Sequence, residues 1–275
     1  MPFRADRLAT LYLFHPLQKL RRQAARIPIL MYHSISAPDD SDRHPYYRTV
    51  TAPRVFEQHL KFLHDSGYKS IGLTDAVSRL REGAPPNERT VVITFDDGFE
   101  DFYSQAFPLL SQYGFTATMF LPTSYIDRDT RKFNGVECLT WSQVRELRKA
   151  GIEFGSHTVT HPQLRDVSTE QMRTEVGRSK ADIEEKLGER VEAFAYPYAF
   201  PETDAAFVQT LHGALQESEY RSGVTTVIGR AGRTDNPFFM RRLPVNSADD
   251  SRFFQAKLEG GYDWLHTAQY ASKLL

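Results

Sequence analysis

Two clusters of residues able to bind a metal directly follow short apolar runs in the sequence. The first is the pair Asp96 and Asp97, which follows an apolar run at residues 90–95. Adjacent carboxylates repel one another unless they share a cation or a proton, and Gly98 permits a sharp backbone bend that brings both toward one point. The pair therefore indicates a cation site. The alternative is that both side chains cap a helix that begins near Asp101.

The second cluster, residues 155–162, contains His157 and His161. Two histidines four residues apart on a helical turn point the same way and can share a metal with a carboxylate. With Asp97 they supply three protein ligands and leave one position for water, as in catalytic zinc sites. A histidine pair alone is more typical of a polar loop, but the neighbouring aspartates favour a metal. Because Cys138 is the only cysteine, a cysteine-rich zinc cluster is excluded.

Further polar or aromatic residues follow two other apolar runs. Residues 194–200 contain Tyr196, Pro197 and Tyr198. Such an aromatic run is usually packing, but its place at a strand end favours a role in the site. His33 ends the first apolar run and is expected to face the same side of the molecule.

The elements that must position these residues alternate between strand and helix. Capping-box patterns at Thr140 and Ser168 open two helices, and apolar residues recur at helical spacing over 102–113. Such alternation implies parallel pairing that can close into an α/β barrel, with the chemistry at the carboxyl ends of the strands. The predicted strands are residues 27–35, 90–95, 117–121, 152–157, 193–198 and 222–227.

In order and spacing, these three clusters resemble the first three motifs of the polysaccharide deacetylase family, carbohydrate esterase family 4, over roughly residues 28–245. The resemblance implies a distorted (β/α) barrel of the NodB homology type. It also implies a divalent metal, with zinc expected first and cobalt, nickel or manganese as alternatives. The implied substrate is an N-acetylated oligo- or polysaccharide that loses its acetyl group.

Carried over residue by residue, the resemblance makes Asp97, His157 and His161 the metal ligands and Asp96 the general base. The backbone N–H of Tyr198 matches the donor to the developing oxyanion. These roles are chemically consistent, since a bound zinc lowers the pKa of its water from 15.7 to about 7 and polarises a carbonyl.

One departure from the family concerns the third motif, where many relatives carry an arginine that holds the base. Ala195 stands at that position here. Arg241 and Arg242 lie near a late predicted strand, and Arg242 is our candidate for this task. Its replacement by Met should then cost activity more than stability. The alternative interpretation of Arg242 is a surface salt bridge.

A second departure concerns the general acid, because no clear match exists to the Leu-x-Leu-His-like motif of many relatives. His33 is our candidate for the acid or for substrate binding. Alternatively, Asp96 returns its proton to the leaving amine. His212 and His266 are interpreted as packed or solvated histidines.

Charge and the two ends of the chain bear on partners and location. The 275 residues contain 34 Lys and Arg against 35 Asp and Glu, so no overall basic field argues for nucleic acid. We expect a basic N-terminal extension over residues 1–26 and a catalytic domain over 27–275, with a closing helical tail from 246. The apolar run 8–14 lacks a small-residue cleavage site, and the uncharged run 107–126 is broken by proline and glycine. We therefore expect neither a signal peptide nor a spanning helix, and a cytoplasmic location. The extension is interpreted as a helix packed against the domain or as a frayed terminus, and the alternative is peripheral contact with the inner membrane face.

The leading functional hypothesis is a metal-dependent N-deacetylase that modifies an exopolysaccharide, a cell-wall polymer or its precursor. One alternative is a related metal-dependent hydrolase of a small amide or imide, because a shared metal site does not define the substrate. Another is a non-catalytic carbohydrate-binding relative. Retention of Asp96 argues against the last, since binding alone needs no base. The sequence indicates neither the polymer nor an oligomeric state.

Overall fold

Parallel strands close into a barrel at the centre of the molecule. The computed structural model describes residues 4–20, 25–37, 44–83 and 89–273. In this part of the chain seven strands form the ring, because β6 also pairs with β2, the first strand of the sheet. β5 (Lys69–Ser70), the last strand of the sheet, pairs with β6 from outside the ring. The predicted α/β barrel is confirmed, and its seven strands distort the eight-stranded arrangement. The order around the ring is β2 (Ile29–Tyr32), β14 (Met240–Pro244), β12 (Ser222–Ile228), β11 (Ala193–Ala195), β10 (Glu153–Ser156), β7 (Thr118–Leu121) and β6 (Thr90–Phe95).

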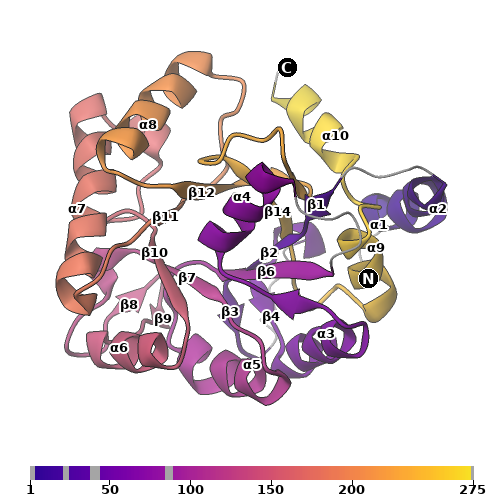
Figure 1. Ribbon diagram of the computed structural model, residues 1–275, viewed down its shortest axis with the longest axis horizontal. Coiled ribbons are helices and arrows are strands. Elements are labelled where there is room, and N and C mark those ends of the chain that lie inside the picture. The colour runs from indigo at the N-terminus through magenta and orange to yellow at the C-terminus, as the bar shows by residue number, and fades with distance from the viewer. Residues whose placement is uncertain (1–3, 21–24, 38–43, 84–88, 274–275) are drawn as a thin grey trace.

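Helices surround the barrel (Figure 1). The capping boxes predicted at Thr140 and Ser168 are present at the starts of α6 and α7. The predicted helix over 102–113 forms a π-helical turn, Phe102–Ala106, followed by an α-helix that ends at Gly114 in the left-handed conformation. The helices from α3 onward are α3 (Pro53–Asp65), α4 (Leu73–Glu82), α5 (Phe107–Tyr113), α6 (Trp141–Lys149), α7 (Thr169–Leu187), α8 (Ala205–Glu217), α9 (Ser251–Leu258) and α10 (Leu265–Ser272).

The predicted single strand over 27–35 is divided into three. β1 (Arg26–Ile27) pairs antiparallel with β13 (Ala231–Gly232), β2 belongs to the barrel, and β3 (Ser34–Ile35) pairs with β4 (Val50–Thr51). Pro28 separates the first two because it has no N–H to donate to a ladder. A hairpin of β8 (Lys132–Phe133) and β9 (Val136–Glu137) completes the strands of the described residues.

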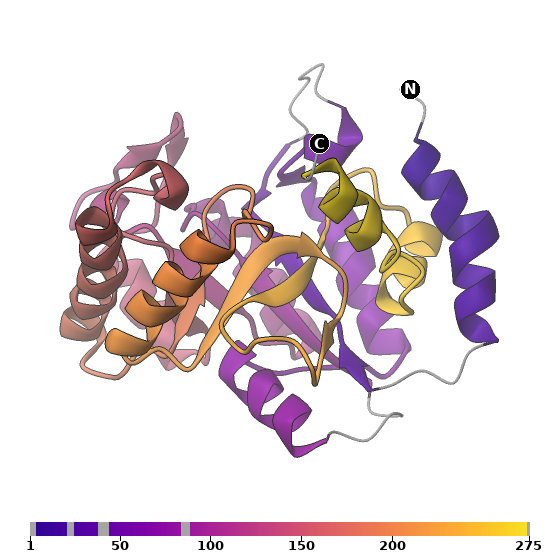
Figure 2. The ribbon, with the colours of Figure 1, turned by 90° about the horizontal axis from the view of Figure 1, so that it is seen from above.

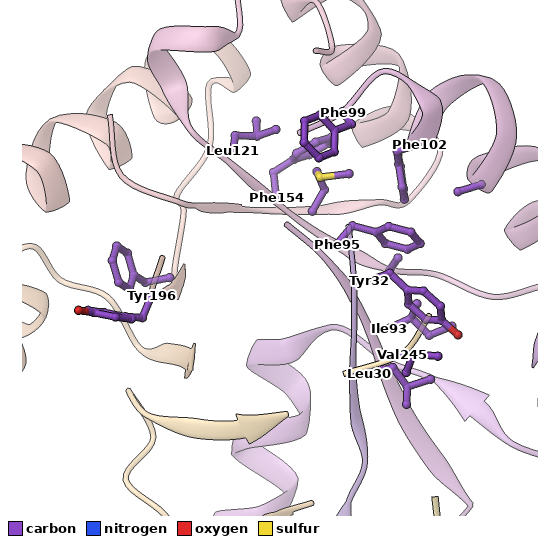
Figure 3. Close-up of a cluster of buried hydrophobic side chains, with 14 of the residues drawn as sticks. Leu30, Tyr32, Ile93, Phe95, Phe99, Phe102, Leu121, Phe154, Tyr196 and Val245 are labelled. Atoms are coloured by element: carbon purple, nitrogen blue, oxygen red, sulfur yellow. The ribbon is translucent and has the colours of Figure 1, made fainter. Parts of the chain in front are cut away.

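Side chains alternate between two cores along the barrel strands. Outward-facing residues such as Leu30, Tyr32 and Phe95 pack between strands and helices (Figure 3). Inward-facing residues such as Val92 and Phe120 form a second cluster with the apolar face of α4. Since α4 packs against the inward-facing apolar residues, the other end of the barrel, where the strands end, is left to polar side chains.

The first and the last described segments of the chain are helical. α1 (Ala5–Ala9), a π-helical turn at Thr10–Phe14 and α2 (His15–Lys19) follow one another and pack beside the C-terminal helices (Figure 2). Among the described residues, no helix is both long enough and apolar enough to cross a bilayer.

A buried histidine outside the barrel makes stability depend on pH. His59 of α3 donates from Nε2 to the Asp249 carbonyl at 2.7 Å and accepts from the Tyr32 hydroxyl at 3.1 Å. Burial lowers the pKa of His59 from 6.5 to about 4. Between these values the unfolded chain binds a proton that the folded chain does not, so stability is full above pH 6.5 and falls toward pH 4.

We therefore expect the His59 contribution to unfolding free energy to fall by about 2 kcal/mol between pH 7 and pH 5. Urea unfolding of wild type and His59→Gln at both pH values separates the His59 contribution to the unfolding free energy from the contribution of the carboxylates. An equal pH dependence in the two proteins would contradict the assignment.

Candidate metal centre

The structure brings Asp97, His157 and His161 together at the carboxyl end of the barrel. The two histidine Nε2 atoms lie 3.2 Å apart, and Asp97 Oδ1 lies 3.6 Å from His157 Nε2 and 3.3 Å from His161 Nε2. One ligand atom from each residue can be chosen so that all lie within 4.8 Å of one another. This is the compactness that a shared cation requires.

The strand ends explain why these side chains converge. Asp97 follows β6 and His157 follows β10, two strands separated in the ring only by β7. Asp97 adopts φ 72° and Gly98 φ 63°, so the chain turns sharply at the end of β6. A Cβ at Gly98 would lie 3.0 Å from a Leu121 methyl group, which adds a packing reason for glycine.

The predicted helical turn from His157 to His161 is wrong. These residues form an irregular loop with left-handed backbone at Thr158, φ 69°, and His161, φ 56°. The His161 N–H donates to Thr158 Oγ1 at 3.0 Å, and the Glu175 carboxylate accepts from the Val159 and Thr160 N–H groups at 2.8 Å each. These bonds replace helical ones, and strain of this kind is typical of functional sites.

The donor atoms fit a divalent cation. The Ala195 carbonyl lies 2.8 Å from His157 Nδ1, and because a carbonyl only accepts, Nδ1 carries the hydrogen and leaves the Nε2 lone pair for a metal. Asp97 Oδ1 is buried and makes no hydrogen bond within the described structure. Burial and the charge of Asp96 raise the pKa of Asp97 to about 8, while burial and His157 lower the pKa of His161 to about 3. A cation at this point would stabilise the ionised form of Asp97 and bind the neutral form of His161.

Asp96, the neighbour of Asp97, is held by Arg242. Arg242 Nη1 and Nη2 donate to the two carboxylate oxygens at 2.7 Å each. Arg242 also donates to Thr94 Oγ1 at 3.2 Å and to the Thr225 carbonyl at 2.9 Å. Burial would raise the pKa of Asp96, but the charge and hydrogen bonds of Arg242, together with the charges of His157 and His33, lower that pKa well below its usual range. Neither aspartate therefore acts as the helix cap considered above.

Arg242 is fully buried in the barrel interior, so the surface salt bridge considered above is wrong. It projects from β14, while Ala195 on β11 packs in the same inner cluster as the inward-facing residues. Because Ala195 on β11 is small, the barrel interior has room for the long Arg242 side chain from β14. Sequence reasoning missed Thr94 and Thr225 as its partners, although Thr94 lies inside the first cluster.

His33 lies beside Asp96 for a topological reason. β2 and β6 pair in parallel with Tyr32 opposite Phe95, so the next residue of each strand leaves the barrel at the same place. His33 Nε2 is 3.9 Å from Asp96 Oδ2, and its side chain is 19% exposed. The histidine can therefore contact both the carboxylate and a bound molecule.

Tyr198 contributes its backbone from a strained turn. It has φ 60° and its N–H makes no hydrogen bond to another residue in the described part of the chain. Thr226 Oγ1 donates to the Tyr198 carbonyl at 3.0 Å and accepts from the Phe200 N–H at 2.9 Å. The Tyr198 ring centroid is 4.7 Å from that of His161. The Tyr198 side chain thus lies next to the cluster, and its backbone is fixed by Thr226.

The other sequence candidates lie elsewhere. His212 packs against Phe238, and His266 pairs with Glu202 at 2.9 Å. Neither belongs to the cluster, as the sequence interpretation expects. Phe133 of β8, which that interpretation did not name, packs against His161, with the two ring centroids 4.9 Å apart.

The fold and site define an α/β-barrel protein with a two-histidine, one-aspartate centre and a separately held carboxylate. A family description, polysaccharide deacetylase, matches residues 83–215. The Bacillus subtilis protein YxkH, assigned by its name to the polysaccharide deacetylases, is 32% identical over 235 residues, which span 86% of this chain and 77% of that protein. The chain belongs to the polysaccharide deacetylase family, and the resemblance inferred from the motifs is confirmed.

Two further comparisons agree. A Staphylococcus aureus poly-β-1,6-N-acetyl-D-glucosamine N-deacetylase is 25% identical over 206 residues, 69% of this chain and 70% of that protein. The solved structure of the Streptococcus pyogenes deacetylase PplD in complex with acetate superposes with a TM-score of 0.74 at 27% identity, covering 86% of this chain and 99% of that one. IcaB from Ammonifex degensii, at 22% identity and a TM-score of 0.71 over 86% of this chain and 98% of that one, shares the fold.

Proposed function

We propose that this protein is a metal-dependent hydrolase that removes N-linked acetyl groups from an acetylamino sugar. The observation that carries the proposal is the buried Asp96 carboxylate, held on both oxygens by Arg242, directly beside the cluster of Asp97, His157 and His161. A purely binding protein has no use for a carboxylate positioned in this way.

Each residue has a defined task in amide hydrolysis. A divalent ion, most simply zinc, held by Asp97 and the two histidines would polarise the acetyl carbonyl and acidify a water molecule. Asp96 accepts the proton of the attacking water, and Arg242 keeps the carboxylate ionised and oriented. The Tyr198 N–H donates to the carbonyl oxygen as negative charge develops on it.

The substrate we propose is a polymer of N-acetylglucosamine or its oligomers, as in an exopolysaccharide or a cell wall. Support comes from the name of the Staphylococcus aureus relative, which specifies a β-1,6-linked polymer. The β-1,6 linkage is therefore the first to test. A hydrolase of a small amide or imide is the competing outcome.

Acetate release from a panel of N-acetylglucosamine oligomers and polymers tests the function. We expect release by metal-loaded protein, none after chelation, and a rate about 10² to 10⁴-fold lower in Asp96→Asn. Asp166→Asn, an exposed aspartate outside the site, is the matched control. Bound metal without acetate release from any member would overturn the sugar assignment and direct the search to small amides.

His33 is proposed as the general acid that protonates the leaving amine. We expect His33→Gln to lower kcat about 10² to 10⁴-fold while its melting temperature stays near that of wild type, because the side chain is partly exposed. Steady-state kinetics on the best oligomer decide the point. A loss of only a few-fold would instead assign proton return to Asp96.

A further inference from the structure

The N-terminal helical segment, residues 4–20, has one face fixed against the C-terminal helices. Thr10 and Leu11 are buried. Trp264 Nε1 donates to Thr10 Oγ1 at 3.1 Å, and the Trp264 ring stacks on Phe14 with centroids 4.7 Å apart. The Arg7 side chain pairs with Asp250. These contacts determine which side of the segment faces outward.

The outward side is apolar. Of the nine exposed large hydrophobic residues in the described parts of the chain, five lie on this one segment, and the other four are distributed over other elements. Exposed apolar residues gathered in one place are typical of an interaction surface. We call these five the outer apolar face: Leu8, Tyr12, Leu13, Leu17 and Leu20, exposed by 42%, 64%, 53%, 46% and 84%.

The sequence around this face is positively charged. Residues 4–26 contain six Lys or Arg and one acid, Asp6, so, with a chain total of −1, the remaining residues sum to −6. The guanidinium of Arg252 on α9 lies 5.0 Å from the centre of the Tyr12 ring and adds charge beside the face. The six basic residues are Arg4, Arg7, Lys19, Arg21, Arg22 and Arg26.

We propose that the outer apolar face lies on the surface of a bilayer that carries anionic lipid headgroups. Leucine and tyrosine side chains enter the interface while the positive charge around the face attracts the anionic headgroups, which is how amphipathic segments bind membranes. A symmetric contact with a second copy fits less well. It would bring this patch against itself and place two basic clusters together.

Sedimentation with vesicles tests the proposal on the full chain. We expect binding to vesicles of equal phosphatidylglycerol and phosphatidylcholine, weaker binding at high salt, and none to phosphatidylcholine alone. Leu13→Glu combined with Leu17→Glu should weaken binding about tenfold or more. Tyr270→Glu, at an exposed apolar residue on α10, is the matched control and should bind like wild type.

Three results would overturn the proposal. They are wild-type protein that stays in solution with anionic vesicles, a double variant that binds as well as wild type, and a wild-type dimer that the double variant converts to a monomer. The last would assign the face to a second copy. The salt dependence of wild type needs no variant, and an unchanged melting temperature shows that the double variant is folded. None of these measurements depends on catalysis, so they test membrane binding independently of the deacetylase function.

Discussion

His161→Ala is expected to lose the stoichiometric metal and to release acetate at least about 10³-fold more slowly than wild type. In the proposed site His161 would supply one of three protein ligands, and its Nε2 lies 3.3 Å from Asp97 Oδ1 and 3.2 Å from His157 Nε2. Without it only two ligands remain, fewer than a catalytic zinc site uses. The rate falls because the metal supplies several kcal/mol of transition-state stabilisation. Metal analysis of the purified protein and acetate release measure both effects.

A stability readout separates the metal site from catalysis. A ligand that binds only the folded state raises the melting temperature, so zinc should raise that of wild type and of His212→Ala but not that of His161→Ala. His212 is a suitable control because it packs against Phe238, outside the cluster. Metal retained at full occupancy by His161→Ala would show that His161 is not a ligand.

The convergence of Asp97 and His157 could be predicted from sequence because each lies just beyond the end of an apolar strand. A parallel barrel brings all strand ends to one side, so Asp97 after β6 and His157 after β10 meet without any knowledge of the loops. The conformation between His157 and His161 could not be predicted. It depends on left-handed backbone at Thr158 and on bonds to Glu175, a residue on another element with no sequence signal of its own.

The partner of Asp96 illustrates the same limit. The sequence analysis names Arg242 ahead of Arg241 as the candidate. Local sequence gives no reason for that preference, because adjacent residues of a strand face opposite sides and only the register decides which faces inward. In the structure β12 is irregular between Val224 and Ile228, and Ile228 aligns with Arg242. Arg242 is buried against Asp96, whereas Arg241 faces the other way, with its Nη2 atom 3.8 Å from Asp235 Oδ1. The strand register, which local sequence does not reveal, therefore determines which of the two arginines faces inward.

Arg242→Met is expected to lower acetate release about 10²-fold, because misplacing a reacting group by about 1 Å has an effect of that size. The structure changes the expectation that activity suffers more than stability. Removing Arg242 leaves the Asp96 carboxylate buried without its charge partner, which costs about 3–5 kcal/mol. Arg241→Met is the matched control, since Arg241 is partly exposed and does not contact Asp96. Unfolding and initial rates below the melting temperature measure both effects.

Restoring the arginine from the other strand distinguishes positioning from general damage. Ala195 is small and lies in the inner cluster, and its link to His157 is through the backbone carbonyl, so Ala195→Arg need not disturb that hydrogen bond. We expect Ala195→Arg combined with Arg242→Met to regain part of the lost rate, because the guanidinium then approaches Asp96 from β11 into the space that Arg242 occupied. A folded double variant no faster than Arg242→Met would show that an arginine at position 195 of β11 cannot replace Arg242 in holding Asp96.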